Sequence, residues 1–336
     1  MTSIDSPLKR VYRKLWKNKL AMFGAGLILF TLLISVLSYF IMPDDSPNAN
    51  EMHLEISTLP PGSEVQFSVI KKSNMVEKPS ILEYWMYGEE SEYTYIPIID
   101  TNNVTNHKEL ITRKYWLGTD RYGRDVLSRM ILGSRVSLSV GIVSVIISML
   151  LGVFLGATAG YYGGKIDAII SWLINVIWSL PSLLLVIAIS FALGKGFWQV
   201  FIAIGLSMWV EVARLVRGQI LSIKNIEYVE AAKALGYHEF RIIFRHILPN
   251  IIGPLFVMAA ANFASAILLE AGLSFLGFGA QPPMPTWGGM VKEHYGYIIM
   301  DAAYLALIPG LAIMVVVYAF NIFSSGLRDA FDQKSN

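Results

Sequence analysis

Long apolar segments separated by polar stretches dominate the pattern of this chain of 336 residues. A helix needs about 20 mainly apolar residues to cross the hydrocarbon core of a bilayer, and six segments meet that requirement. The predicted spans are residues 20–42, 136–160, 167–193, 197–216, 251–278 and 304–326. The pattern therefore predicts an all-α membrane protein with six transmembrane helices.

Two features within the predicted spans bear on helix shape and packing. Pro181 lies inside the third span, where proline removes a backbone hydrogen bond and crowds the preceding turn, so we expect a kink. Gly152, Gly156 and Gly160 recur at intervals of four residues in the second span. Small residues at this spacing let two helix backbones approach closely. We therefore expect the second span to pack tightly against a neighbouring helix.

The polar stretch between the first and second spans, residues 43–113, is long enough to form a small domain. Apolar and polar residues alternate over residues 65–69, which is the period of a half-buried strand. Residues 84–87 and 93–98 are aromatic and β-branched, so they predict further short strands. We expect a small β-containing extracytoplasmic insert between the first two helices.

Charged residues near the spans predict the orientation of the chain. Residues 1–19 carry six basic side chains before the first span and a single acidic one. Cytoplasmic flanks of spans are enriched in Lys and Arg, so this tail is predicted to be cytoplasmic. Six spans then return the C-terminal tail, residues 327–336, to the same side. The basic run 124–135 falls outside and contradicts the rule, from which long loops are largely exempt; we expect it to lie along the outer membrane surface.

Composition narrows the class of function. The chain is 54% hydrophobic and 15% charged, whereas a soluble domain carries about 25% charged residues. The net charge of +2 gives no indication of nucleic-acid binding, and the absence of cysteine excludes disulfides and thiol catalysis. The five histidines are scattered without metal-ligand spacing. We expect neither catalytic residues nor a metal nor a cofactor in this chain, so it is not expected to be an enzyme.

The polar loop between the fourth and fifth spans, residues 218–249, has the pattern of a helical hairpin. Residues 227–235 are good helix formers, and Gly236 follows where a helix commonly ends in a left-handed residue. A second helix is predicted over residues 239–247 and is stopped by Pro249. Four of its apolar side chains share one face at helical spacing: Phe240, Ile243, Phe244 and Ile247. Such a loop is a candidate docking surface for a soluble partner.

The spacing within this loop resembles the signature of a known family. The matching residues, in the pattern Glu-Ala-Ala-x3-Gly-x11-Leu-Pro, are Glu230, Ala231, Ala232, Gly236, Leu248 and Pro249. The pattern is similar to the signature loop of the integral membrane subunits of binding-protein-dependent ABC importers. Further stretches narrow the resemblance to the second permease of the dipeptide/oligopeptide/nickel group: residues 17–20, 116–129, 273–279 and 285–290. The resemblance covers residues 8–42 and 114–331, and it departs from the family in the long insert.

The resemblance implies a fold and a set of partners. The fold would be that of a type I ABC importer permease, with a first helix at 20–42 and a five-helix core at 114–326. The partners would be a homologous second permease, two cytoplasmic ATPases and an extracytoplasmic binding protein, in a bacterial cytoplasmic (inner) membrane. ATP and magnesium would be bound by the ATPases, because this chain has no Gly-x4-Gly-Lys-Ser/Thr phosphate loop.

The resemblance also implies roles for residues of the loop. Glu230 would be the exposed charge at its front, Ala231 and Ala232 would allow close packing in a groove of an ATPase, and Gly236 would set the angle between the two loop helices. The substrate would be a di- or oligopeptide, with nickel chelates or another small solute as alternatives. The insert would either stabilise the assembly or grip the binding protein.

Polar residues within the spans are candidates for the translocation path. Glu270, Asn262 and Ser265 lie in the fifth span, and Glu270 either meets a peptide amino terminus or caps a short outer helix. Charges in the bilayer are costly, so Glu211 is expected to pair with Arg214, three residues later. A stand-alone secondary transporter is the alternative class. It would require ionisable residues at mid-membrane and two similar halves, and the sequence shows neither clearly.

Overall fold

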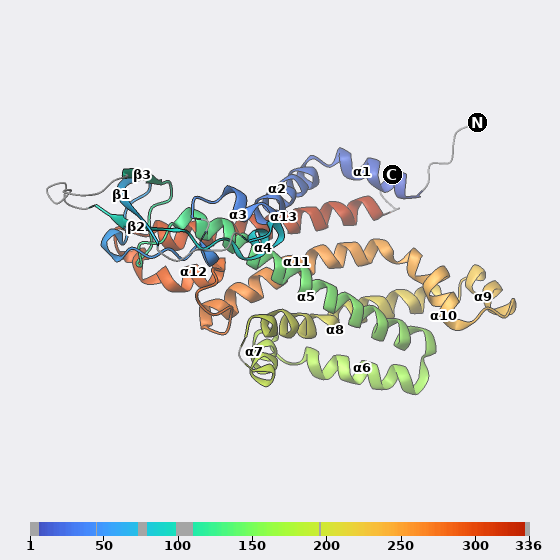
Figure 1. Cartoon of the computed structure of the whole chain (residues 1–336). Coiled ribbons are helices and arrows are strands. Elements are labelled where there is room, and N and C mark those ends of the chain that lie inside the picture. Colours follow the sequence, from blue (N-terminus) through green and yellow to red (C-terminus); the bar gives the residue numbers. More distant parts are fainter. Residues whose placement is uncertain (1–6, 45, 73–78, 99–109, 195, 333–336) are drawn as a thin grey trace. The chain divides into compact units, whose positions relative to one another are not determined.

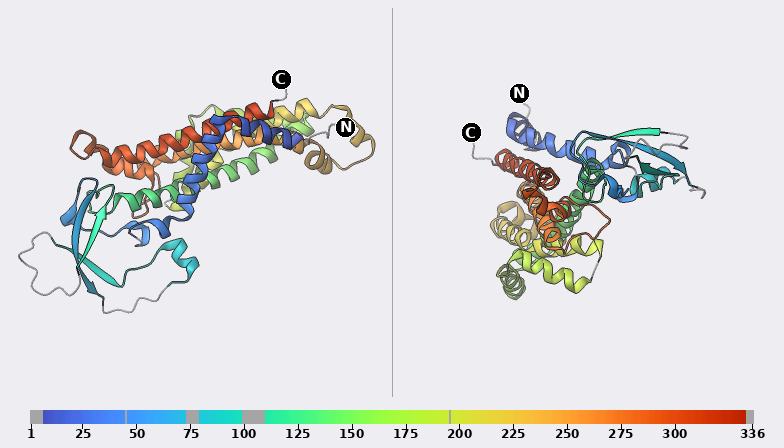
Figure 2. Two further views of the ribbon diagram at one scale, coloured as in Figure 1. Left: turned by 90° about the horizontal axis from the view of Figure 1, so that it is seen from above. Right: turned by 90° about the vertical axis from the view of Figure 1, so that its left-hand side faces the viewer.

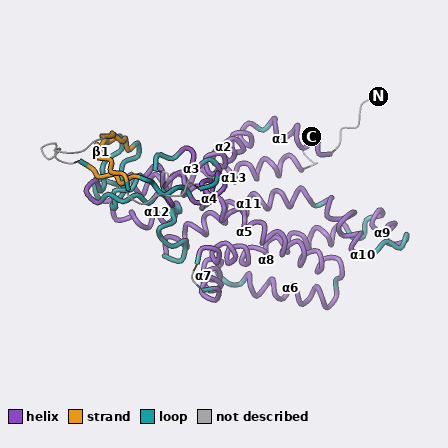
Figure 3. The backbone as a smooth tube through the Cα atoms, viewed as in Figure 1, coloured by secondary structure: helices purple, strands orange, loops and turns teal. Residues whose placement is uncertain are grey.

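The structure is a computed structural model that describes residues 7–44, 46–72, 79–98, 110–194 and 196–332 (Figure 1). The chain forms two compact units, and each is described by itself. The first unit comprises Met1–Leu29, Ser139–Leu273 and Met314–Asn336, and the second comprises Phe30–Leu138 and Ser274–Ile313. The three strands lie in the second unit, and the rest of the described chain is almost entirely helical (Figure 3).

Within the described residues, five helices have the length and apolar composition to cross a membrane. They are α2 (Lys19–Val36), α5 (Val126–Tyr162), α8 (Phe197–Ile223), α11 (Ile252–Leu276) and α13 (Tyr304–Phe331). These helices correspond to five of the six predicted spans. The first span is shorter than predicted, because a break at Leu37 separates α2 from the single turn α3 (Ser38–Ile41).

The third predicted span is two helices rather than one kinked helix. α6 (Gly164–Trp178) and α7 (Ser182–Leu193) meet at a bend of 99°. Pro181 precedes the first residue of α7, and a proline disfavours helical backbone at the residue before it, so the helix ends ahead of it. The Ser179 hydroxyl donates a 2.7 Å hydrogen bond to the Val176 carbonyl at the end of α6. The bend is therefore much larger than the kink that the sequence predicts.

The glycine series in α5 packs against α8, as the sequence predicts. A Cβ added at Gly152 would lie 2.4 Å from Val212 Cβ, and one at Gly156 would lie 2.4 Å from the Ala213 carbonyl oxygen. At Gly160 the added Cβ would lie 3.0 Å from a backbone oxygen of α8. These distances leave no room for a side chain, so the two backbones are in direct contact.

The N-terminal helix α1 (Pro7–Lys17) also belongs to the first unit. Both views of Figure 2 show it beside the C-terminal end of α13. The Lys14 ammonium donates a 3.1 Å hydrogen bond to the Asp332 carbonyl at that end. α1 thus joins the N-terminal segment to the last membrane-length helix.

The second unit contains a three-stranded antiparallel sheet in the order β2-β1-β3. The strands are β1 (Ser63–Lys71), β2 (Tyr93–Pro97) and β3 (Leu110–Tyr115). Phe67 in the central strand is opposite Pro97 on one side and Ile111 on the other, and it forms the buried centre of a small core with Ile56 and Tyr115. β1 and β2 confirm the predicted strands, and β3 was not predicted.

The predicted strand over residues 84–87 is wrong, because these residues belong to the helix α4 (Ile81–Tyr87). Ser80 and Glu83 form a capping box in which each side chain accepts a hydrogen bond from the other residue's backbone N–H. This cap satisfies two backbone donors that a helix start would otherwise leave unpaired. The local cap outweighs the β propensity of the aromatic residues.

The basic run 124–135 does not lie along a membrane surface as the sequence predicts. Most of it forms the first turns of α5, and the side chains of Arg124 and Arg129 are buried within the second unit. α12 (Trp287–His294) packs beside them, and the Trp287 indole donates a 3.0 Å hydrogen bond to the Met130 carbonyl. Arg124 and Arg129 instead form ion pairs with acidic residues.

Candidate functional site

The first half of the loop, residues 218–249, is the helix α9 (Glu227–Ala234) with a well-defined C-terminal cap. Gly236 has φ of +73°, which confirms the predicted left-handed residue. Its N–H donates to the Lys233 carbonyl at 2.9 Å, and the Tyr237 N–H donates to the Ala232 carbonyl at 3.2 Å. This pair of bonds is a Schellman motif, which satisfies carbonyls at the end of a helix. The chain therefore leaves α9 in a fixed direction.

The second half of the loop differs from the single helix that the sequence predicts. It consists of α10 (Glu239–Ile242), a π-helical turn (Ile243–Ile247) and a 3-10 turn (Leu248–Asn250). The π turn holds more residues than an α turn, so it shifts the phase of the side chains. Ile243 and Ile247 are buried, whereas Phe240 and Phe244 are exposed and stack with ring centroids 4.2 Å apart.

The loop is fastened to the end of α8 by a buried apolar cluster. Val229, Ala232, Ile242 and Ile247 from the loop pack with Val216 and other α8 residues. A fully buried Val or Ile contributes about 1.5–3 kcal/mol through removal from water. The loop and this helix end therefore share one buried core within the first unit.

The signature residues occupy different places in this arrangement. Glu230, Ala231, Gly236 and Pro249 are exposed, and Leu248 is half-buried. Ala232 is only 3% exposed and lies inside the loop's own core. Its small side chain thus serves packing within the loop, and of the two alanines only Ala231 is accessible to a partner.

Large apolar side chains are exposed on the loop outside the membrane-length helices. Leu235, Tyr237, Phe240 and Phe244 are together called the loop apolar patch, and Leu235 is 72% exposed. Exposed apolar side chains that gather in one place mark interaction sites. The sequence analysis placed Phe240 and Phe244 on one face with Ile243 and Ile247 and did not single out Leu235 or Tyr237. The structure divides that face, with the two isoleucines buried and the two phenylalanines exposed.

The three path candidates on α11 differ in their surroundings. Asn262 and Glu270 are each 1% exposed, whereas Ser265 is exposed. The side-chain amide nitrogen of Asn262 is buried without a hydrogen-bond partner. Asn262 and Glu270 are thus enclosed within the protein, and Ser265 lies on another face of the helix.

The expected Glu211–Arg214 ion pair does not form. The Arg214 guanidinium lies 3.4 Å over the Trp178 ring and donates to the Asn175 side chain at 3.3 Å. A different pair links α6 and α8, in which Arg217 Nη2 donates to Asp167 Oδ2 at 2.7 Å. The partners are far apart in the chain, so no local pattern indicated this pair.

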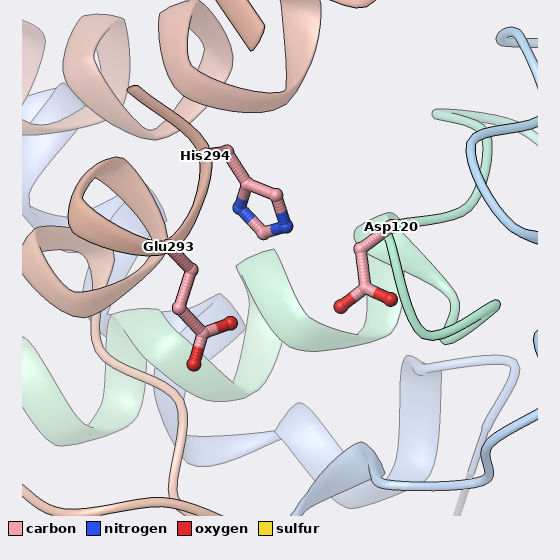
Figure 4. Close-up of side chains that lie close together, drawn as sticks. All are labelled: Asp120, Glu293 and His294. Atoms are coloured by element: carbon pink, nitrogen blue, oxygen red, sulfur yellow. The ribbon is translucent and has the colours of Figure 1, made fainter. Parts of the chain in front are cut away.

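The second unit holds a buried cluster of charges that the sequence analysis did not identify. Asp120, Glu293 and His294 lie close together (Figure 4), with ligand atoms within 4.8 Å of one another. Arg124 forms an ion pair with each of the two carboxylates: its Nε lies 2.6 Å from Asp120 Oδ2, and its Nη2 lies 2.9 Å from Glu293 Oε2. Arg129 lies 3.8 Å from each. Two guanidiniums thus balance two carboxylates and would repel a metal ion.

His294 is the uncharged member of this cluster. Its Nδ1 lies 2.8 Å from the Met290 carbonyl and donates to it. Burial lowers the pKa of His294 below its usual value, because the charged ring is disfavoured away from water. The cluster is therefore an ion-pair network with a neutral histidine, not a metal centre.

Comparisons with known proteins agree with this arrangement. The family described as binding-protein-dependent transport system inner membrane component matches residues 152–336. The N-terminal TM domain of oligopeptide transport permease C matches residues 6–61. The two matches leave the three-stranded sheet and the first part of α5 outside.

Two curated relatives and one solved structure illustrate the similarity. The dipeptide transport system permease protein DppC of Bacillus subtilis (strain 168) is 35% identical over 96% of this chain and 84% of its own length. The glutathione transport system permease protein GsiD of Pectobacterium atrosepticum is 43% identical over 66% of this chain and 73% of its own length. A chain of the inward-facing MetNI methionine ABC transporter aligns with a TM-score of 0.50 at 17% identity, over 61% of this chain and 96% of that one.

The structural similarity supports the fold, and the sequence matches support the family. The family match covers more than half of the chain, and the Bacillus subtilis relative extends it to nearly the full length. The membrane-length helices are those of a multi-pass inner-membrane protein. The chain belongs to the family of inner membrane components of binding-protein-dependent transport systems, as a permease of the dipeptide/oligopeptide ABC group.

Proposed function

We propose that this permease forms a translocation path for di- and oligopeptides and is coupled to cytoplasmic ATPases through the loop 218–249. The observation that carries the coupling is the loop apolar patch, which protrudes from a rigidly packed helix end. Relatives whose printed names refer to dipeptides and glutathione support the peptide class.

The geometry supports coupling by rigid-body motion. A force applied at Leu235 or Phe240 would pass through Val229 and Ile247 into α8, because Val229 and Ile247 are buried in one cluster with residues of that helix. Interdigitated cores change between discrete packings rather than deforming continuously. Closure of the ATPases on ATP would therefore move α8 and switch the access of the path.

The remaining partners follow from this proposal. A homologous second permease completes the path, two ATPases bind ATP and magnesium, and an extracytoplasmic binding protein delivers the peptide. Both termini and the coupling loop lie in the cytoplasm. The basic α1, which carries Lys9, Arg10 and Arg13, supports this orientation, because basic residues flank spans on the cytoplasmic side.

Cysteine crosslinking tests the coupling surface, because the chain contains no cysteine. In the assembled transporter, Leu235→Cys is expected to crosslink to an ATPase subunit with a short bifunctional maleimide. Ala232→Cys is the matched control, since that position is buried and should react little. Crosslinks of Leu235→Cys to random proteins, with none to an ATPase, would contradict the proposal.

Analysis of the bound solute tests the substrate class. The complex is purified with its binding protein, the ligand is released, and mass spectrometry identifies it. Short peptides of mixed sequence are the expected result. A metal chelate as the main ligand would overturn the peptide assignment and leave the coupling proposal in place.

A further inference from the structure

A pocket of about 490 Å³ that is lined in part by charged residues lies in the second unit, outside the coupling loop and the path candidates. It is formed by the segment from Ser274 to Tyr297 together with Arg121 and Arg129 near the start of α5. Its volume is in the range of sites that hold small molecules. No role has been assigned to it above.

Arg129 supplies a buried positive charge with unused bonding capacity to this pocket. Its side chain is 3% exposed and lies 3.8 Å from both Asp120 and Glu293. Its one hydrogen bond, to the Ala49 carbonyl, is long at 3.5 Å, and its Nε has no hydrogen-bond partner. Arg129 shares the charges of Asp120 and Glu293 with Arg124, but a buried N–H donor without a close acceptor is unfavourable. It can be compensated by an anion that enters the pocket.

Two further cations line the same pocket. Lys292 places its ammonium over Gly277, where an added Cβ would lie 2.5 Å from it. Arg121 lies with its guanidinium 4.5 Å over the Tyr122 ring. Within the described part of the chain, neither Lys292 nor Arg121 has an ion-pair partner.

The charge balance of the lining favours an anion. Arg121, Arg129 and Lys292 are positive, and Glu293 is the single negative side chain, so three minus one leaves +2. Glu293 is already bound at 2.9 Å by Arg124, which lies outside the pocket lining. A cation or metal ion would meet net repulsion here.

The donor types fit a carboxylate or a phosphate, and of these a short peptide carries a carboxylate, at its C-terminus. A guanidinium presents its N–H groups as a planar fork that matches a carboxylate, and an ammonium adds a point charge. We propose that this pocket binds the terminal carboxylate of the transported solute, a short peptide, through Lys292, Arg129 and Arg121. The inference rests on the proposed peptide function and names the part of the peptide that the permease itself recognises.

The test measures peptide binding to the purified transporter complex without its binding protein. Equilibrium dialysis with radiolabelled trialanine compares the free acid with its C-terminal amide. The wild type is expected to bind the free acid about tenfold or more tightly than the amide, because charge-assisted hydrogen bonds are lost in the amide.

Variants of Lys292 make the test specific to the pocket. Lys292→Gln is expected to reduce the preference for the acid severalfold, and Lys292→Arg is expected to retain most of it. Lys292 is exposed, so these changes should not affect folding. Lys165→Gln, at an exposed lysine of the first unit, is the matched control and should bind as the wild type.

Three outcomes would overturn the inference. The first is equal binding of acid and amide by the wild type, and the second is an unchanged preference in Lys292→Gln. The third is that Lys292→Gln weakens association of the binding protein while peptide binding stays the same. Uptake of trialanine by the wild-type complex, reconstituted in proteoliposomes with its binding protein, is measured in parallel. Uptake with any of these outcomes overturns the pocket and leaves the proposed function standing, whereas absence of uptake overturns both.

Discussion

At the scale of single residues, Gly236 sets the direction in which the chain leaves α9. Its φ of +73° lies in the left-handed region, and an added Cβ would meet nothing within 4 Å. The requirement for glycine therefore comes from the backbone and not from crowding. A residue with a Cβ costs about 1–2 kcal/mol in this conformation, and the loop can relieve that strain by changing the angle between its two halves.

Replacing Gly236 by leucine is expected to lower peptide uptake per ATP hydrolysed, because the tilted patch no longer transmits force to α8. Uptake and ATPase activity in proteoliposomes measure this ratio. Gly236→Asn should retain more coupling, since asparagine tolerates the left-handed region. Gly218→Ala is the control, at a helical position with nothing within 4 Å. Unchanged coupling in Gly236→Leu at normal expression would refute the role.

His294 makes stability depend on pH. Burial lowers its pKa below 6.5, so the unfolded chain binds the proton more tightly than the folded one. The contribution of the neutral His294 to the free energy of unfolding is complete above about pH 6.5. It is lost as the pH falls below that value, by at most about 1.4 kcal/mol per pH unit. His294→Gln is expected to reduce this loss, measured as the thermal midpoint at about pH 5.5 relative to about pH 7.5.

Two other buried groups of the second unit contribute to the free energy of unfolding with the opposite sign. Burial raises the pKa values of Asp44 and Asp125, so the folded state favours their protonated forms and gains stability as the pH falls. These carboxyls are present in both proteins, so the difference between wild type and variant isolates the histidine. Equal pH dependence of the two proteins would show that His294 does not titrate on unfolding.

At the scale of elements, the contact between α5 and α8 determines how the coupling loop is held. The glycines Gly152 and Gly156 leave α5 without side chains at the positions where Val212 and Ala213 of α8 approach it. Close contact of two backbones gains dispersion energy over many atom pairs. This contact anchors the helix to which the loop is fastened.

Gly156→Val is expected to destabilise the protein by about 1–3 kcal/mol, the usual range for overpacking. The physical reason is a Cβ only 2.4 Å from the Ala213 carbonyl oxygen. The thermal midpoint of the detergent-solubilised protein should fall by several degrees. Gly26→Ala is the matched control, because its added Cβ meets nothing within 4 Å. A midpoint equal to that of the wild type would contradict the packing argument.

The sequence predicted those elements whose signal is local. The Gly236 cap, the strand around Phe67 and the glycine contact of α5 each follow from a few neighbouring residues, and the structure confirms them. The α4 cap overrode aromatic β propensity, and a π turn interrupts the second helix predicted for the loop. The Asp120 network joins segments distant in sequence, so no periodicity could reveal it.

At the scale of the whole molecule, the proposed partners require α1 and the insert to lie on opposite sides of the membrane. Trp16 in α1 is 56% exposed and Ile81 in the insert is 84% exposed. In the cysteine-free chain, Trp16→Cys and Ile81→Cys provide one reporter for each side. A membrane-impermeant maleimide added to intact spheroplasts is expected to label Ile81→Cys alone, and to label both after permeabilisation. Labelling of both in intact cells would contradict the proposed orientation.

The bend between α6 and α7 bears on whether the chain makes an even or an odd number of membrane crossings before the loop 218–249. With 15 and 12 residues, the two helices are about 22 Å and about 18 Å long, so neither alone crosses a hydrocarbon core of about 30 Å. If the pair together makes one crossing, α8 runs inward and the loop 218–249 meets the cytoplasm. If the pair made none, the same loop would emerge on the opposite side, away from any ATPase. The proposed coupling therefore requires α6 and α7, which are separated at Pro181, to cross the membrane once as a pair.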